Sequence, residues 1–285
     1  MSSIKQYLSL VKFSHTIFAL PFACIGFALA LHQGFSFSPK LFLLVLVCMV
    51  TARNSAMAFN RYIDRKFDAL NPRTAIREIP AGIIQPKNAF YFIVVNCLLF
   101  IVATFFINSI CFYLSPVALF AVLFYSYTKR FTPLCHLVLG CGLALAPIGA
   151  YLAVTGVFAW LPLLFSFTVL TWVSGFDIIY ALQDEAFDRE HHLNSIPVLL
   201  GAKGALRFSE ILHVLSIGCV IMAGFVGHFN ATIYWIGVSL FSGLVIYQHT
   251  IVKPDDLSRV NLAFGTTNGI ASVVFAIFTI VSLFV

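Results

Sequence analysis

Long apolar runs without charge alternate with short charged segments along the whole chain. A helix needs about 20 apolar residues to cross a membrane, so runs of that length predict one span each and runs of twice that length predict two. The chain is therefore predicted to form nine transmembrane helices, with turns inside the double runs near Asn108, Gly156 and 227–230. The single runs are 13–39, 41–59 (interrupted only by Arg53) and 260–285, and the double runs are 88–128, 131–176 and 211–252.

The composition agrees with an all-α integral membrane protein. Of the 285 residues, 60% are hydrophobic and only 10% are charged, whereas a soluble domain carries about 25% charge. An ordinary cytosolic domain, a disordered chain and a coiled coil are thereby excluded. The seven cysteines are odd in number and form no close pairs, so we expect reduced cysteines that pack between helices. We treat 1–285 as a single transmembrane domain.

The charged residues gather on one side of the predicted membrane. With nine spans, all of the 17 Lys and Arg except Lys40 and Arg53 fall on the side that holds the N-terminus. The positive-inside rule makes that side cytoplasmic and places the C-terminus outside, in a multi-pass inner (cytoplasmic) cell membrane. The net charge of +6 is then explained by loops beside the lipid bilayer, and no nucleic-acid partner is expected. All 11 acids lie on the same side, which predicts a functional site there.

The first acidic cluster lies at the cytoplasmic end of the second span. Asn60, Asp64 and Asp68 are spaced i, i+4, i+8 and so share one face of a helix. Stacked carboxylates repel each other unless a cation bridges them. Oxygen ligands with few carboxylates per metal are typical of Mg²⁺ whose shell is completed by phosphate. The alternative is a solvated helix end whose acids are bridged by the arginine and lysine side chains between them.

The second acidic cluster lies at the end of the sixth span. Asp177, Tyr180, Asp184 and Asp188 follow i, i+3, i+7, i+11 and are expected to form one helical stripe. Asp177 lies inside the apolar run, where an acid is a functional candidate by default; the alternative is an acid paired with a nearby Tyr or Lys. The clusters lie four spans apart, which suggests two four-helix pseudo-repeats plus a ninth helix around a central cavity.

Basic and hydroxyl side chains accompany both acidic clusters. Arginine and lysine beside metal-binding acids indicate an anion with several phosphate oxygens. Arg53 lies about two turns inside the second span, where it can capture a carboxylate or phosphate or pair with an acid such as Asp177. The other candidates for the anion site are Arg73, Arg77, Tyr125, Lys129 and Arg130.

These residues resemble the motifs of the UbiA superfamily of membrane prenyltransferases. Asn60-x-x-x-Asp64-x-x-x-Asp68 is similar to its first aspartate-rich motif and Asp184-x-x-x-Asp188 to its second. The segment 73–82 and the pair Tyr125-x-x-x-Lys129 also resemble the family. Arg61 stands where the first motif commonly has Asp, and this Asn-Arg variant is similar to the 4-hydroxybenzoate polyprenyltransferase-like branch.

The resemblance implies Mg²⁺-dependent transfer of a polyprenyl group from a polyprenyl diphosphate to an aromatic acid, of the 4-hydroxybenzoate type, in ubiquinone or menaquinone synthesis. A dihydroxynaphthoate acceptor remains an alternative. From another class, a secondary transporter also remains open, because carriers have repeated halves and intramembrane charges.

The resemblance also implies roles for single residues. The catalytic acids are Asp64, Asp68, Asp177, Asp184 and Asp188, and all of these except Asp177 join Asn60 as Mg²⁺ ligands. Asp177 orients a phenol or accepts the ring proton. The diphosphate contacts Arg73, Arg77, Tyr125 and Lys129. The carboxylate of the aromatic substrate is held by Arg53 or Lys12, near Tyr180, with His15 as a weaker candidate.

Overall fold

The computed structural model describes residues 3–285, apart from the side chains of residues 3, 4 and 13–15. This part of the chain is helical and contains no β-strand. Eight of its helical segments are long and apolar enough to cross a membrane. They are formed by α3 (Pro39–Leu70), α4 (Pro86–Ile107), α5 (Ser109–Thr128), α6 (Cys135–Thr155), α7 (Trp160–Ala181), α9 (Ile196–Val226), α10 (Ala231–Ile251) and α11 (Asn268–Phe284).

The predicted turns coincide with the observed helix ends. Asn108 separates α4 from α5 and caps the latter, because its side chain accepts a hydrogen bond from the backbone N–H of Cys111. Gly156 ends α6 with φ +70°, a left-handed conformation that suits glycine. Residues 227–230 separate α9 from α10. The sequence pattern therefore predicted these boundaries correctly.

The first predicted span is shorter in the structure than the run 13–39. A 3₁₀-helix covers Phe13–Phe18, and the α-helix α2 covers only Leu20–His32. Pro21 lies in the first turn of α2, where proline favours a helix start, and Gly34 turns the chain away with φ +95°. The whole apolar helical stretch, Thr16–His32, has 17 residues.

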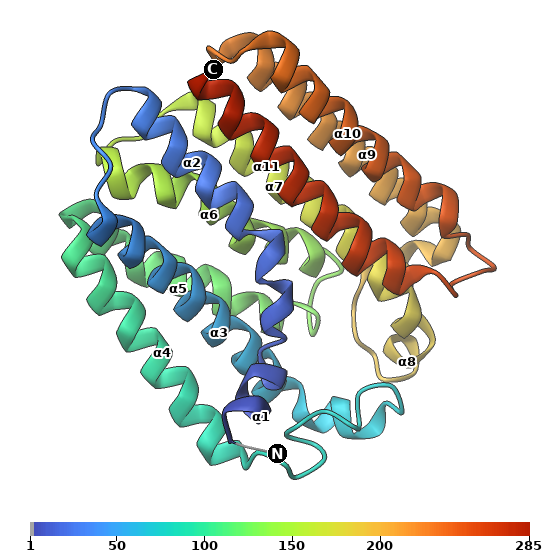
Figure 1. Cartoon of the computed structure of the whole chain (residues 1–285). Coiled ribbons are helices and arrows are strands. Elements are labelled where there is room, and N and C mark those ends of the chain that lie inside the picture. Colours follow the sequence, from blue (N-terminus) through green and yellow to red (C-terminus); the bar gives the residue numbers. More distant parts are fainter. Residues whose placement is uncertain (1–2) are drawn as a thin grey trace.

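Helices α2, α6, α7 and α9–α11 enclose an aromatic core that includes Phe22, Trp172, Phe241 and Phe275. Helix α2 packs against α6 and α11, and Ser272 of α11 donates a hydrogen bond to the carbonyl of Ile17, 2.8 Å away. In Figure 1, α3, α4 and α5 lie on one side of the bundle and α9 and α10 on the other, with α2, α6, α7 and α11 between them. Large apolar side chains cover much of the outer surface, as lipid contact requires.

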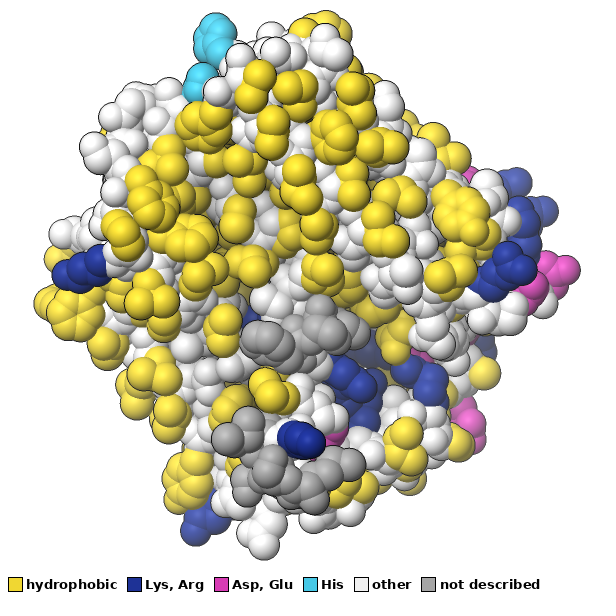
Figure 2. All heavy atoms as spheres, viewed as in Figure 1, with side chains coloured by type: hydrophobic (Ala, Val, Ile, Leu, Met, Phe, Trp, Pro, Cys, Tyr) yellow, Lys and Arg dark blue, Asp and Glu magenta, His cyan; other side chains and the backbone are white. Residues whose placement is uncertain are grey.

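One end of the bundle is built for polar chemistry. Helix α3 has 32 residues and is about 48 Å long, so its last turns extend beyond a hydrocarbon layer of about 30 Å. The segment 71–85 and the short helices α1 (Ser3–Leu10) and α8 (Glu185–Glu190) lie at that end, and the C-terminus lies at the other (Figure 1). Figure 2 shows a hollow in a largely apolar surface, where Lys and Arg side chains gather.

Candidate active site

The first acidic cluster is neutralised by basic residues from other segments. Arg130 Nη2 lies 2.8 Å from Asp64 Oδ1, and Arg77 Nη1 lies 2.7 Å from Asp68 Oδ1. Asn60 completes the face of α3 by donating its side-chain N–H to Asp64 Oδ2 at 3.0 Å. These acids pair with arginines outside α3, and not with the basic residues between them on the same helix.

The second acidic cluster does not form one continuous α-helical stripe, contrary to the sequence prediction. Helix α7 ends at Ala181, the 3₁₀-helix η2 covers Leu182–Asp184, and α8 follows. The side-chain amide of Gln183 donates a hydrogen bond to the carbonyl of Tyr180 within this break. The three acids of this cluster have three different partners.

Asp184 is held by the segment that follows the first motif. Arg73 donates hydrogen bonds to both carboxylate oxygens of Asp184, with Nε 3.0 Å from Oδ1. Asn71 donates its amide N–H to Oδ1 at 3.1 Å. Burial disfavours the charged form of Arg73, but the bonds to Asp184 raise the pKa of Arg73 above its ordinary value. Arg73 Nη1 also donates to the Tyr180 hydroxyl at 3.1 Å. Tyr180 was predicted to contact the aromatic substrate. It lies beside Arg73, which was predicted to bind the diphosphate.

Asp188 pairs with Lys129, and this pair links the two motifs. Lys129 Nζ lies 2.7 Å from Asp188 Oδ2, and the Asp188 side chain is only 1% exposed. Burial acts against the ammonium group, but attraction to Asp188 raises the pKa of Lys129 above its ordinary value. The next residue, Arg130, holds Asp64. Two adjacent basic residues thus bind one acid from each motif, which brings both motifs to one site.

Asp177 pairs with a residue that the sequence analysis did not identify. His136, the second residue of α6, places Nδ1 2.7 Å from Asp177 Oδ2. A lone histidine at the start of an apolar helix carries no spacing signal, and only its position opposite an intramembrane acid could have indicated it. Tyr125 is half-buried and interacts electrostatically with Asp64, Asp177 and Arg53, so Asp177 belongs to the same polar region.

Arg53 binds the N-terminal segment rather than Asp177. Its guanidinium donates to Thr16 Oγ1 at 3.1 Å and to the carbonyl of Lys12 at 2.9 Å. Lys12 has φ +45° and an exposed side chain, and its carbonyl rather than its ammonium group makes this contact. The side chain of His15, the weaker candidate, lies outside the described residues.

The oxygen donors of this site fit a hard divalent cation. Asp68 Oδ2 is buried and has no hydrogen-bond partner among the described residues, so it is free to accept a ligand bond. Carboxylate and amide oxygens are the donors that Mg²⁺ prefers. Within 3–285, no three His, Cys, Asp or Glu side chains already converge on a single point, because each motif acid is held by a basic residue.

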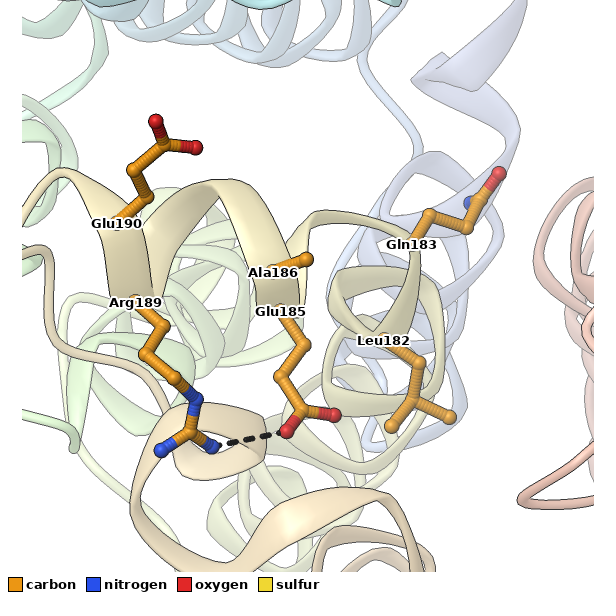
Figure 3. A pocket seen from close by; sticks show the side chains of 6 residues that line it. All are labelled: Leu182, Gln183, Glu185, Ala186, Arg189 and Glu190. Carbon is orange, nitrogen blue, oxygen red and sulfur yellow. Dashed lines mark hydrogen bonds and ion pairs between the residues drawn. The ribbon is translucent and has the colours of Figure 1, made fainter.

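A shallow surface pocket lies next to this site without sharing its key acids. It is formed around η2 and α8, and Figure 3 shows Arg189 and Glu185 of this pocket joined by an ion pair at 3.0 Å. Its lining residues are Leu182, Gln183, Glu185, Ala186, Arg189 and Glu190. None of these was predicted to bind metal or diphosphate, so the pocket is not the centre of the candidate site.

Comparison with known proteins identifies the family. The model of the UbiA prenyltransferase family matches residues 19–280. A 4-hydroxybenzoate octaprenyltransferase of Tolumonas auensis is 29% identical over 83% of this chain and 82% of its own length. One from Francisella tularensis subsp. mediasiatica is also 29% identical, with 80% of each chain covered.

Solved structures have the same fold. A UbiA homologue from Aeropyrum pernix K1 matches with a TM-score of 0.83 and 32% identity, over 94% of this chain and 97% of that one. A homologue from Archaeoglobus fulgidus, solved with GPP and Mg²⁺ bound, matches with a TM-score of 0.74 and 20% identity, over 98% and 100% of the two chains. With two aspartate motifs meeting at one end of a membrane bundle, and with the family model matching nearly its whole length, the chain belongs to the UbiA prenyltransferase family and is a membrane prenyltransferase.

Proposed function

We propose that this prenyltransferase transfers a polyprenyl group from a polyprenyl diphosphate to an aromatic acid of the 4-hydroxybenzoate type, in the synthesis of respiratory quinones, with Mg²⁺ as cofactor. The observation that carries the proposal is the pairing of both aspartate motifs with Lys129 and the adjacent Arg130. The acids proposed to bind metal and the basic residues proposed to bind phosphate thereby lie together at one site. An enzyme that acts on a metal-bound diphosphate requires such an arrangement.

The motif side chains are proposed to bind the diphosphate through metal and directly. The Mg²⁺ ligands would be Asn60, Asp64, Asp68, Asp184 and Asp188. When bound, Mg²⁺ supplies stabilisation of the negative charge that develops on the departing diphosphate. Arg73, Arg77 and Lys129 each carry a positive charge into the same region, and Tyr125 adds a hydroxyl. These fixed groups stabilise the leaving group electrostatically without reorganising during the reaction.

The acceptor is proposed to lie on the deeper side of the site. Arg53 is fixed by Thr16 and the carbonyl of Lys12, and its guanidinium is suited to the carboxylate of an aromatic acid. Asp177 is the acid that lies inside the apolar helix α7. It is proposed to accept the proton that the ring loses after the new C–C bond has formed. Phenylalanine and tyrosine rings favour a nearby allylic cation through their faces.

We also propose a membrane arrangement for the single domain 1–285. The shorter apolar helix Thr16–His32 would form the first of nine crossings, followed by α3, α4, α5, α6, α7, α9, α10 and α11. The N-terminus and the active site would face the cytoplasm, because the Lys and Arg residues gather there. Two pseudo-repeats are supported by the equivalent packing of α3 on α4 and of α7 on α9, since the first acidic motif lies on α3 and the second directly follows α7.

The direct test is prenyl transfer by the purified protein in detergent. Polyprenyl diphosphate and Mg²⁺ are supplied with 4-hydroxybenzoate in one reaction and with a dihydroxynaphthoate acid in another, and product is identified by mass spectrometry. A C-prenylated 4-hydroxybenzoate with release of pyrophosphate supports the proposal. If product forms only with the naphthoate acid, that acid is the acceptor in place of 4-hydroxybenzoate. If neither acid gives a C-prenylated product, the proposal is refuted.

A further inference from the structure

The pair formed by His136 and Asp177 has no part in metal or diphosphate binding. His136 is 3% exposed, and its Nδ1 lies 2.7 Å from Asp177 Oδ2. The other ring nitrogen, Nε2, is buried and has no hydrogen-bond partner among the described residues. A buried polar residue with one satisfied and one unsatisfied nitrogen calls for a reason beyond packing.

The acid partner identifies one ring nitrogen that carries hydrogen. An ionised carboxylate only accepts hydrogen bonds, so Nδ1 of His136 carries a hydrogen whether the ring is neutral or protonated. His136 is then a donor to Asp177 Oδ2. A carboxylate that accepts this bond keeps its second oxygen, Oδ1, for another contact.

The backbones of α6 and α7 hold the pair in place. Ser174 donates its hydroxyl to the carbonyl of His136 at 3.1 Å and to that of Leu170 at 2.6 Å. Gly140, one turn after His136, lies so close to α7 that an added Cβ would be 2.3 Å from Ser174 Oγ. The two helices are therefore tightly packed at this point, and this packing holds the donor of His136 close to Asp177.

Asp177 is less deeply buried than its partner. Its side chain is 23% exposed, against 4% for that of His136, and it lies near Tyr125, which also lies near Arg53. The Asp177 carboxylate is therefore accessible, and it is close to the residues proposed to bind the acceptor.

We propose that His136 is a positioning residue: it fixes the Asp177 carboxylate so that Oδ1 meets the aromatic acceptor. This inference rests on the proposed function. The allylic C–O bond breaks with its electron pair leaving on the diphosphate, and ring electrons form the new C–C bond. The ring C–H bond then breaks, its electrons restore aromaticity, and its proton passes to Asp177 Oδ1. Throughout, His136 donates to Oδ2 without changing its protonation.

The test compares three replacements of His136 by steady-state kinetics with varied acceptor and varied polyprenyl diphosphate. Asn places its amide N–H at the position of Nδ1, whereas Gln places it one bond farther away and Leu has no donor. We expect His136→Leu and His136→Gln to lower kcat about 10- to 100-fold, as a displaced catalytic group does, with an unchanged KM for the polyprenyl diphosphate. We expect His136→Asn to retain most of the activity.

A double variant separates positioning from a general loss of structure. If His136 acts only through Asp177, His136→Leu in an Asp177→Asn background should cause no further loss of kcat, because the two effects are coupled. Additive losses, equal defects in the Asn and Gln variants, or a fully active His136→Leu variant would overturn the inference while leaving the proposed function intact. A wild-type protein that prenylates no aromatic acid would overturn both.

Discussion

Replacing Lys129 by methionine tests the ion pair that joins the two motifs. The substitution keeps much of the apolar stem and removes the ammonium group, which leaves the carboxylate of Asp188 without its cation. Asp188 is 1% exposed and cannot exchange the lost partner for water. Removing one member of a buried ion pair costs about 3–5 kcal/mol. Because the Lys129 side chain is 31% exposed and solvent screens its charge, we expect a cost below this range or at its lower limit, about 2–3 kcal/mol.

The assay is thermal unfolding of the purified protein in detergent, without substrate. A loss of this size predicts an unfolding midpoint that is lower by roughly 5–10 °C. The control Lys40→Met removes an exposed lysine at the start of α3 and should leave the midpoint unchanged. The double variant Lys129→Met/Asp188→Leu should recover most of the stability, because replacing both members of a buried pair by apolar groups is often neutral.

The pH dependence gives a second check on the same pair. Because the pKa of Lys129 is raised in the folded protein, its contribution to stability is complete below the ordinary lysine pKa of about 10.4 and is lost only as the pH rises through the raised value. The difference in midpoint between wild type and Lys129→Met should therefore be constant near neutral pH and shrink in strong alkali. A Lys129→Met variant as stable as Lys40→Met would refute the reasoning.

Further predictions concern the metal, the motif acids and helix packing. EDTA should abolish prenyl transfer and excess Mg²⁺ should restore it, whereas full activity in EDTA would remove the metal from the mechanism. Asp64→Asn and Asp184→Asn should each abolish turnover while the protein still elutes as a folded species by size-exclusion chromatography; normal rates in both would contradict the assigned roles. Gly26→Ala should cost about 1–3 kcal/mol by overpacking, because its Cβ would lie 2.0 Å from the carbonyl oxygen of Pro147. The matched change Gly149→Ala, with no atom within 4 Å of the new Cβ, should leave thermal stability nearly unchanged.

Apolar runs predicted several helix boundaries because each span needs a minimum apolar length to cross the membrane. The turns at Asn108 and Gly156 were predicted because each interrupts a run that is twice that length. The start of the chain was predicted less well: a 3₁₀-helix replaces the beginning of the first span, and hydropathy does not distinguish the two conformations. The break of the second acidic stripe after Ala181 was missed for a related reason, since the spacing of the acids does not show where an α-helix gives way to a 3₁₀-helix.

The residue types of the candidate site were predictable, but their pairing was not. The spacing of Asp64 and Asp68 on one helical face is a local property that sequence encodes directly. Their partners Arg130 and Arg77 come from other segments, and such pairs depend on how helices pack. His136 was invisible for the same reason, because its significance arises only from its distance to an acid on the neighbouring helix.

The contacts of α2 also bear on how the protein is assembled in the cell. A ribosome releases this helix early, and its partners α6 and α11 are synthesised later. The side of α2 that holds Gly26 can pack once α6 has been made, because Gly26 lies against Pro147. The side that contacts α11 has no partner until translation is nearly complete. The same holds for Ile17, in the 3₁₀-helix before α2, whose carbonyl accepts the hydrogen bond from Ser272. The two ends of the chain therefore pack together only at the end of synthesis.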